Sequence, residues 1–158
     1  PTEALRLRYV SRSRLSSDNV TTFSEDSLDL ETYLSLRASV GWKLLKESQA
    51  ERALKNSLLT LTAYIGDEPV GMGRIVGDGA VICYVQDLVV KPEYQKHGVG
   101  RVIMERLIGF VTDIKDADTE IMMCLMCAKG REHFYEKFGF IGRPTEDLGP
   151  GMIQYIRY

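Results

Sequence analysis

The spacing of apolar and polar residues predicts an antiparallel meander in the middle of the chain. Three apolar or alternating segments of strand length follow one another, at 58–65, 70–76 and 80–90. The segments between them, 66–69 and 77–79, contain the glycine and aspartate residues that tight hairpin turns require. We therefore predict three consecutive strands joined by short turns.

Apolar residues at helical spacing predict four helices. The predicted helices lie near 28–38, 44–57, 98–112 and 131–138, and Gly139 ends the last of them. The third has the broadest apolar face, formed by Val102, Ile103, Leu107, Ile108 and Val111. This face predicts that the helix packs on a sheet.

Further strands are predicted at both ends of the chain. Residues 5–10 alternate like an edge strand, whereas 11–28 are rich in Ser, Thr and Asp and are predicted to be a loop. The apolar run 121–127 predicts a central buried strand. The last strands are predicted at 140–141 and 152–157. No repeat or linker divides the chain, so we expect one domain over residues 1–158.

Composition excludes several classes of function. The chain has 158 residues, of which 44% are hydrophobic and 27% charged, and its net charge is −2. Such scattered, balanced charge gives no basic face for nucleic acid. No apolar run reaches bilayer length and the first residues do not resemble a signal peptide, so we expect no membrane contact and a cytoplasmic location. The chain has three cysteines and two histidines. From these numbers we expect reduced thiols and no metal site.

The turn at residues 95–100 has the features of a phosphate-binding site. It follows the apolar strand and opens the third helix, and it contains Gly98 and Gly100. Glycine allows a ligand to approach the main chain closely, and the free N–H groups at a helix start attract an anion. Ile103 replaces the third glycine of a dinucleotide-binding turn, and no Gly-Lys-Ser/Thr triplet is present. A phosphorylated cofactor of another kind is therefore expected.

Residues 86–100 resemble the acetyl-CoA-binding segment of the GNAT superfamily of N-acyltransferases. The shared pattern is Gln/Arg-x-x-Gly-x-Gly/Ala after an apolar strand and a proline, here Pro92. A second match, at 134–140, reads Phe-Tyr-Glu-Lys-Phe-Gly-Phe. The resemblance runs from about Thr60 to the C-terminus. It implies a mixed α/β (α+β) fold with a mostly antiparallel sheet, splayed at the cofactor site and flanked by helices.

The resemblance implies that the chain binds acetyl-CoA or CoA. It implies that a bulge splays the strand before the turn from the parallel strand 121–127, so that the pantetheine arm lies between them. A main-chain N–H, that of Val90, would then face the thioester carbonyl. The cofactor-binding residues expected from the family are Leu88, Val89, Val90, Gln95, Lys96, His97, Gly98, Val99, Gly100 and Arg101.

Two residues are catalytic candidates by resemblance. Tyr135 occupies the place where many family members have a tyrosine that donates a proton to the departing thiolate. Asp87 is the only carboxylate on the strand before the turn, and it would act as general base or orient the amine. The alternative for Asp87 is a hydrogen bond to the backbone beside the bulge. Many relatives have Asn seven residues before the tyrosine, where this chain has Ala128.

The expected reaction is acetyl transfer to a primary amine by direct attack in a ternary complex. The acceptor-site candidates are Arg37, Trp42 and Arg74, which favour a small amine such as an amino sugar or a polyamine. Acetylation of protein lysines or N-termini is an alternative. So is a CoA-binding regulatory module without turnover, or a dimeric adaptor without a ligand. Family members often dimerise through late strands, so a homodimer also stays open.

Overall fold

The computed structural model describes residues 10–11 and 20–157. The chain forms two compact units, one up to Leu125 and one from Met126 onward, and each is described by itself. The single domain expected from the sequence stays a prediction. Among the described residues, none of the helices combines the length and the apolar character needed to cross a membrane.

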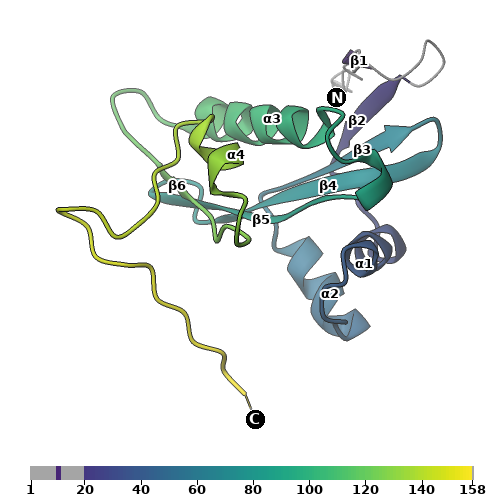
Figure 1. Cartoon of the computed structure of the whole chain (residues 1–158), viewed down its shortest axis with the longest axis horizontal. Helices are drawn as coiled ribbons and strands as arrows, with labels where there is room; N and C mark the ends of the chain where they lie inside the picture. Colours follow the sequence, from purple (N-terminus) through teal and green to yellow (C-terminus); the bar gives the residue numbers. More distant parts are fainter. Residues whose placement is uncertain (1–9, 12–19, 158) are drawn as a thin grey trace, which may run out of the picture. The chain divides into compact units, whose positions relative to one another are not determined.

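The first unit is built on a six-stranded sheet (Figure 1). The strands follow one another in chain order, and every neighbouring pair is antiparallel except the last, β5 with β6, which is parallel. Their bounds are β1 Val10–Ser11, β2 Thr21–Glu25, β3 Leu59–Ile65, β4 Glu68–Gly77, β5 Ile82–Val90 and β6 Met122–Cys124. This sheet confirms the predicted mixed α/β class, and β3, β4 and β5 form the predicted meander.

Helices cover both faces of the sheet (Figure 1). On one face lie α1 (Leu30–Ser39) and α2 (Glu47–Lys55), and Asp29 caps α1 by accepting a hydrogen bond from the Thr32 N–H at 2.8 Å. The core under these helices contains Leu28, Tyr33, Leu36, Ala50, Met72 and Val89. The other face is covered by α3 (Val99–Ile114), which buries Val102, Ile103, Leu107 and Val111 of the predicted apolar face, whereas Ile108 is only half-buried.

Glycine in β4 lets α3 lie close to the sheet. A Cβ atom placed on Gly73 would lie 2.8 Å from Cγ2 of Ile103 and 3.0 Å from Cδ1 of Leu107. Both side chains belong to α3 and are fully buried. The absence of a side chain at Gly73 is therefore what allows α3, and the turn that precedes it, to sit directly against the strands.

Several strand predictions need correction. Residues 21–25 form β2 within the predicted loop, because Thr21 and Phe23 bury one side of a polar strand that pairs with β3. The run 121–127 is not a central strand: only β6 is formed, it is the last strand of the sheet, and 54% of Met122 is exposed. The prediction for 5–10 falls mainly on residues outside the described ranges.

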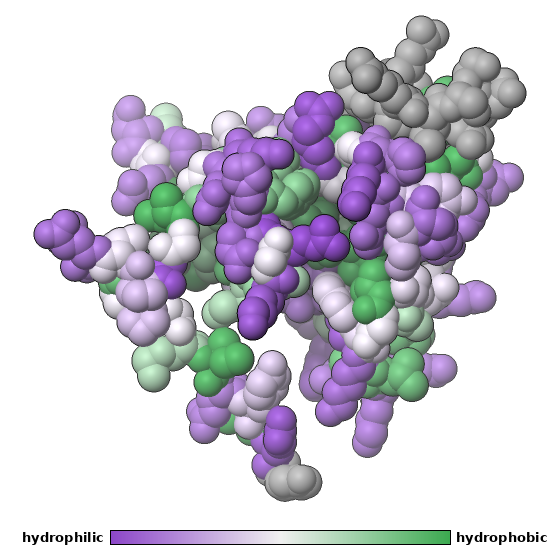
Figure 2. Space-filling model, viewed as in Figure 1, coloured by the Kyte–Doolittle hydropathy of each residue, from purple (hydrophilic) through white to green (hydrophobic). Residues whose placement is uncertain are grey.

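The second unit contains one helix, α4 (Glu132–Glu136), inside the predicted range and followed by Gly139. The predicted strands at 140–141 and 152–157 are absent from the residues the structure describes. A strand needs a partner for its main-chain groups, and apolar composition alone does not supply one. The final segment instead exposes large apolar side chains (Figure 2). Met152 is 88% exposed and Ile156 is 85% exposed.

Candidate active site

The turn between β5 and α3 presents free main-chain N–H groups at the start of a helix. A short 3-10 turn, Pro92–Tyr94, leads into it, and Lys96 and Gly98 have left-handed backbone angles, with φ of 64° and 87°. The first helical hydrogen bond runs from the Val102 N–H to the Gly98 carbonyl at 3.2 Å. No described side chain caps this helix start, so its first-turn N–H groups can receive an anion.

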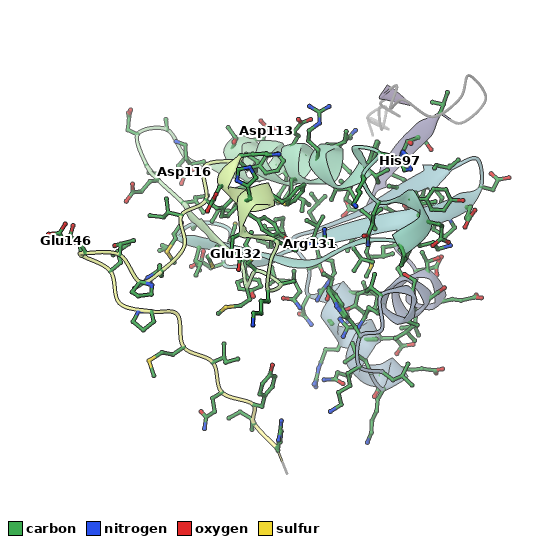
Figure 3. The ribbon with its side chains drawn as sticks, in the orientation of Figure 1. His97, Asp113, Asp116, Arg131, Glu132 and Glu146 are labelled. Carbon is green, nitrogen blue, oxygen red and sulfur yellow. The ribbon has the colours of Figure 1, made fainter. Side chains whose placement is uncertain are left out.

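Side chains around the turn anchor it to the sheet. The Gln95 side-chain amide donates a hydrogen bond to the Val90 carbonyl at 2.9 Å, and this bond links the turn to the end of β5. Glu68 accepts hydrogen bonds from Lys91 at 2.8 Å and from Tyr94 at 2.9 Å, and these two bonds lower the pKa of its carboxyl group. His97 lies exposed at the same turn (Figure 3). The turn is thus held in place before any ligand arrives.

A β-bulge interrupts β5 just before the turn. On either side of the interruption Arg74 pairs with Gln86 and Met72 pairs with Val89, so Asp87 and Leu88 both lie opposite Gly73. Asp87 carries the irregular backbone, with a left-handed φ of 57°. The bulge, at Asp87 and Leu88, overlaps the start of the segment 88–90 in which the oxyanion donor is expected.

The parallel pairing of β5 with β6 is short. It covers three pairs and ends at Tyr84 with Cys124. Among the residues that the structure describes, the β5 edge from Val85 onward has no β6 partner, as the splayed sheet expected from the resemblance requires. An extended ligand can therefore hydrogen-bond to this part of the strand.

Asp87 lies at the centre of a buried polar cluster. Its Oδ2 accepts hydrogen bonds from the Tyr33 hydroxyl at 2.6 Å and from Nε of Arg74 at 2.9 Å. Its Oδ1 accepts from Nη1 of Arg37 at 2.7 Å and from the Gln86 side-chain amide at 3.3 Å. The side chain is 0% exposed, so two buried ion pairs form here. These partners of the Asp87 carboxylate are side chains, whereas the alternative given in the sequence analysis is a hydrogen bond to the backbone beside the bulge.

The three acceptor-site candidates belong to this one cluster. The Arg37 guanidinium lies 5.2 Å from the centre of the Trp42 ring, which is 39% exposed. Arg74 is buried and also donates to the Ala53 carbonyl at 2.9 Å and to the Ser57 hydroxyl at 2.8 Å. Arg74 is therefore a structural connection between β4 and the end of α2, and Trp42 is the member that faces solvent most.

Tyr135 lies in the second unit, on α4. Its ring makes edge-on contacts with Phe134 and Phe140, at centroid distances of 5.0 Å and 6.1 Å. Gly139 follows the helix with a left-handed φ of 87° and turns the chain so that Phe140 returns to the tyrosine. The Tyr135 side chain is half-buried in this aromatic group.

A family model described as "Acetyltransferase (GNAT) domain" matches residues 56–141, which include the bulge, the turn and α4. The chain belongs to the GNAT acetyltransferases. A solved structure from methicillin-resistant Staphylococcus aureus, described as a probable acetyltransferase, is 32% identical with a TM-score of 0.75. The alignment covers 87% of this chain and 99% of that one. The GNAT chain is accordingly an acetyl-transferring enzyme.

Plant relatives of the GNAT chain are longer than it is. "GCN5-related N-acetyltransferase 1, chloroplastic" from Arabidopsis thaliana is 34% identical over 138 residues, 84% of this chain and 66% of that protein. "Serotonin N-acetyltransferase 2, chloroplastic" from Oryza sativa is 35% identical over 90 residues, 54% of this chain and 45% of that protein. Each plant protein therefore contains sequence beyond the part that it shares with this chain.

Sequence reasoning missed two members of the GNAT domain's polar cluster. Neither Tyr33 nor Gln86 is among the candidate site residues named from the sequence. Burial and the hydrogen bond to Asp87 raise the pKa of Tyr33, so its hydroxyl stays a donor. The available signal was the spacing of Tyr33 and Arg37, four residues apart on one helix face.

Proposed function

We propose that this GNAT enzyme transfers the acetyl group of acetyl-CoA to a primary amine of a small molecule. The observation that carries the proposal is the uncapped start of α3 directly after a bulged strand with a partly unpaired edge. A diphosphate needs the first feature, and an extended amide-bearing arm needs the second. Both are parts of CoA.

The cofactor would be held chiefly by main chain. The N–H groups of residues 98–101 would bind the diphosphate, with Lys96, His97 and Arg101 as exposed flanking side chains. The β5 edge at Leu88–Val90 would pair with the pantetheine amides. The Val90 N–H would donate to the thioester oxygen as negative charge develops there.

The proposed chemistry is a direct attack. The amine nitrogen forms a bond to the acetyl carbon, the carbon–sulfur bond breaks, and the amine gives up one proton to solvent. Tyr135 would donate a proton to the departing thiolate sulfur and regain one from water. A phenol, with an ordinary pKa of about 10, can protonate a thiolate whose conjugate acid has a pKa of about 8.5 when the donor is already hydrogen-bonded to the sulfur.

The acceptor would bind beside the segment that joins α1 to α2. Trp42 offers an exposed aromatic surface there, and Arg37 places a cation beneath it. The rice relative is named for serotonin, a small aromatic amine, and this name is in keeping with a small-molecule acceptor. Arg74 contributes indirectly, because its Nε and Nη1 donors are already used within the protein.

The test is a panel of small amines, amino sugars, polyamines and lysine peptides with acetyl-CoA, followed by release of CoA thiol. We expect turnover with one class of small amine, and Tyr135→Phe should lower kcat while the Kd for acetyl-CoA stays unchanged. Phe138→Tyr is the matched control on the same segment. Turnover of peptides alone would refute the small-molecule acceptor. CoA binding without turnover of any amine would favour the regulatory module.

A further inference from the structure

The buried cluster around Asp87 uses every acceptor site of its carboxylate. A carboxylate offers about four lone-pair positions, and Asp87 receives four donors. Those donors come from α1, β4 and β5, and two of them carry full positive charge. A general base needs a lone pair directed at its substrate. Asp87 has none in this arrangement.

The same residue determines the backbone at the bulge. Asp87 adopts a left-handed φ of 57°, a conformation that aspartate tolerates better than most residues but that still requires support. Its carboxylate is fixed from α1 by Arg37 and from β4 by Arg74. Because side chain and backbone belong to one residue, fixing the carboxylate also fixes the direction of the peptide groups that follow it.

We propose that Asp87 is a positioning residue, whose ion pairs with Arg37 and Arg74 hold the β5 bulge so that the Val90 N–H points toward the reacting carbonyl. The proposal rests on the proposed function. Asp87 takes no proton from the amine. Its effect on acetyl transfer is carried through the main chain of the strand.

Arg37 extends this support to the acceptor side of the enzyme. Its Nη2 donates to the Lys43 carbonyl at 3.3 Å, and its guanidinium lies over the rings of Tyr33 and Trp42. One arginine therefore joins the segment after α1 to the bulge. Removal of Arg37 should disturb the bulge even though Asp87 and its pair with Arg74 remain.

The experiment compares Asp87→Asn and Arg37→Met with wild type, using steady-state kinetics, calorimetric binding of acetyl-CoA and a pH–rate profile. Both substitutions should lower kcat by about tenfold to a hundredfold, because small displacements of groups near the reacting atoms have effects of this size. The Kd for acetyl-CoA should rise by a smaller factor than kcat falls, because the diphosphate site at residues 98–101 is unchanged, and the rising limb of the pH profile should stay in place. Arg106→Met, at another paired arginine, is the matched control and should keep the wild-type kcat.

Distinct results would overturn the proposal. Loss of the rising limb in Asp87→Asn, with Arg37→Met retaining its rate, would identify Asp87 as the base. If both variants keep the wild-type kcat at temperatures below their melting temperatures, the cluster has a purely structural role. If Asp87→Asn does not fold, Arg37→Met and Tyr33→Phe carry the same test with the carboxylate intact.

Amide hydrogen exchange gives a readout independent of turnover. Exchange at residues 88–90 should accelerate by about tenfold in Arg37→Met and stay unchanged in the Arg106→Met control. Unchanged exchange in Arg37→Met overturns the positioning role even if no acceptor amine has been found. Failure of wild type to bind acetyl-CoA or acetylate any amine would instead count against the proposed function.

Discussion

Two glycines at one helix should respond to alanine in opposite directions. Gly98 precedes α3 with a left-handed φ of 87°, whereas Gly109 lies inside the same helix. A Cβ atom at either position would meet nothing within 4 Å. Because steric contact is absent at both, the difference between the two variants isolates the preference of the backbone.

The magnitudes follow from conformation alone. Gly98→Ala forces an L side chain into the left-handed region, at a cost of about 1–2 kcal/mol, which the reduced freedom of the unfolded chain offsets by about 0.4–1 kcal/mol. Gly109→Ala replaces a poor helix former by the best one and should stabilise the protein by up to about 1 kcal/mol. The two variants should therefore differ by about 1–2 kcal/mol in free energy of unfolding.

Urea denaturation followed by circular dichroism measures this difference, and thermal melting should show about 2–4 °C per kcal/mol for a chain of this length. The m-value should be equal in wild type and both variants, which confirms that the denatured states are comparable. If Gly98→Ala proves as stable as Gly109→Ala, the turn does not require its left-handed residue, and the account of the phosphate-binding turn is wrong.

Two further perturbations test the packing and the anchor of the turn. Leu107→Ala should lower the free energy of unfolding by about 2–5 kcal/mol in urea titrations, because Leu107 is 0% exposed; the half-buried Ile108→Ala is its control, and an equal loss in both would contradict the assigned face. Glu68→Gln should remove a pH-dependent stabilisation, because Lys91 and Tyr94 lower the folded-state pKa of Glu68. Wild type should exceed Glu68→Gln in free energy of unfolding by its full amount above the ordinary glutamate pKa of about 4.3. This difference should shrink as the pH falls through the lower pKa of Glu68 in the folded protein. A difference that grows in acid would refute the pairing of Glu68 with Lys91 and Tyr94.

Local sequence signals predicted the elements whose causes are themselves local. The Gly66 and Gly77 turns, the apolar face of α3 and the glycine-bearing turn before it were all readable from neighbouring residues. The strands without local signals were misjudged. Strand β2 is rich in threonine and serine, and its pairing with β3 lies about forty residues away along the chain.

The amino-acid sequence by itself determined the meander, the helices and a helix start suited to a phosphate, because hydrophobic spacing and turn chemistry act between residues close along the chain. Only the tertiary structure decided which side chains Asp87 contacts. Its partners Tyr33 and Arg37 are 54 and 50 residues away in sequence, and they reach it because α1 packs over the bulge in β5. A carboxylate that looks free for proton transfer in the sequence accepts hydrogen bonds from two charged and two neutral side chains in the fold, since burial of a charge requires partners that no local pattern specifies.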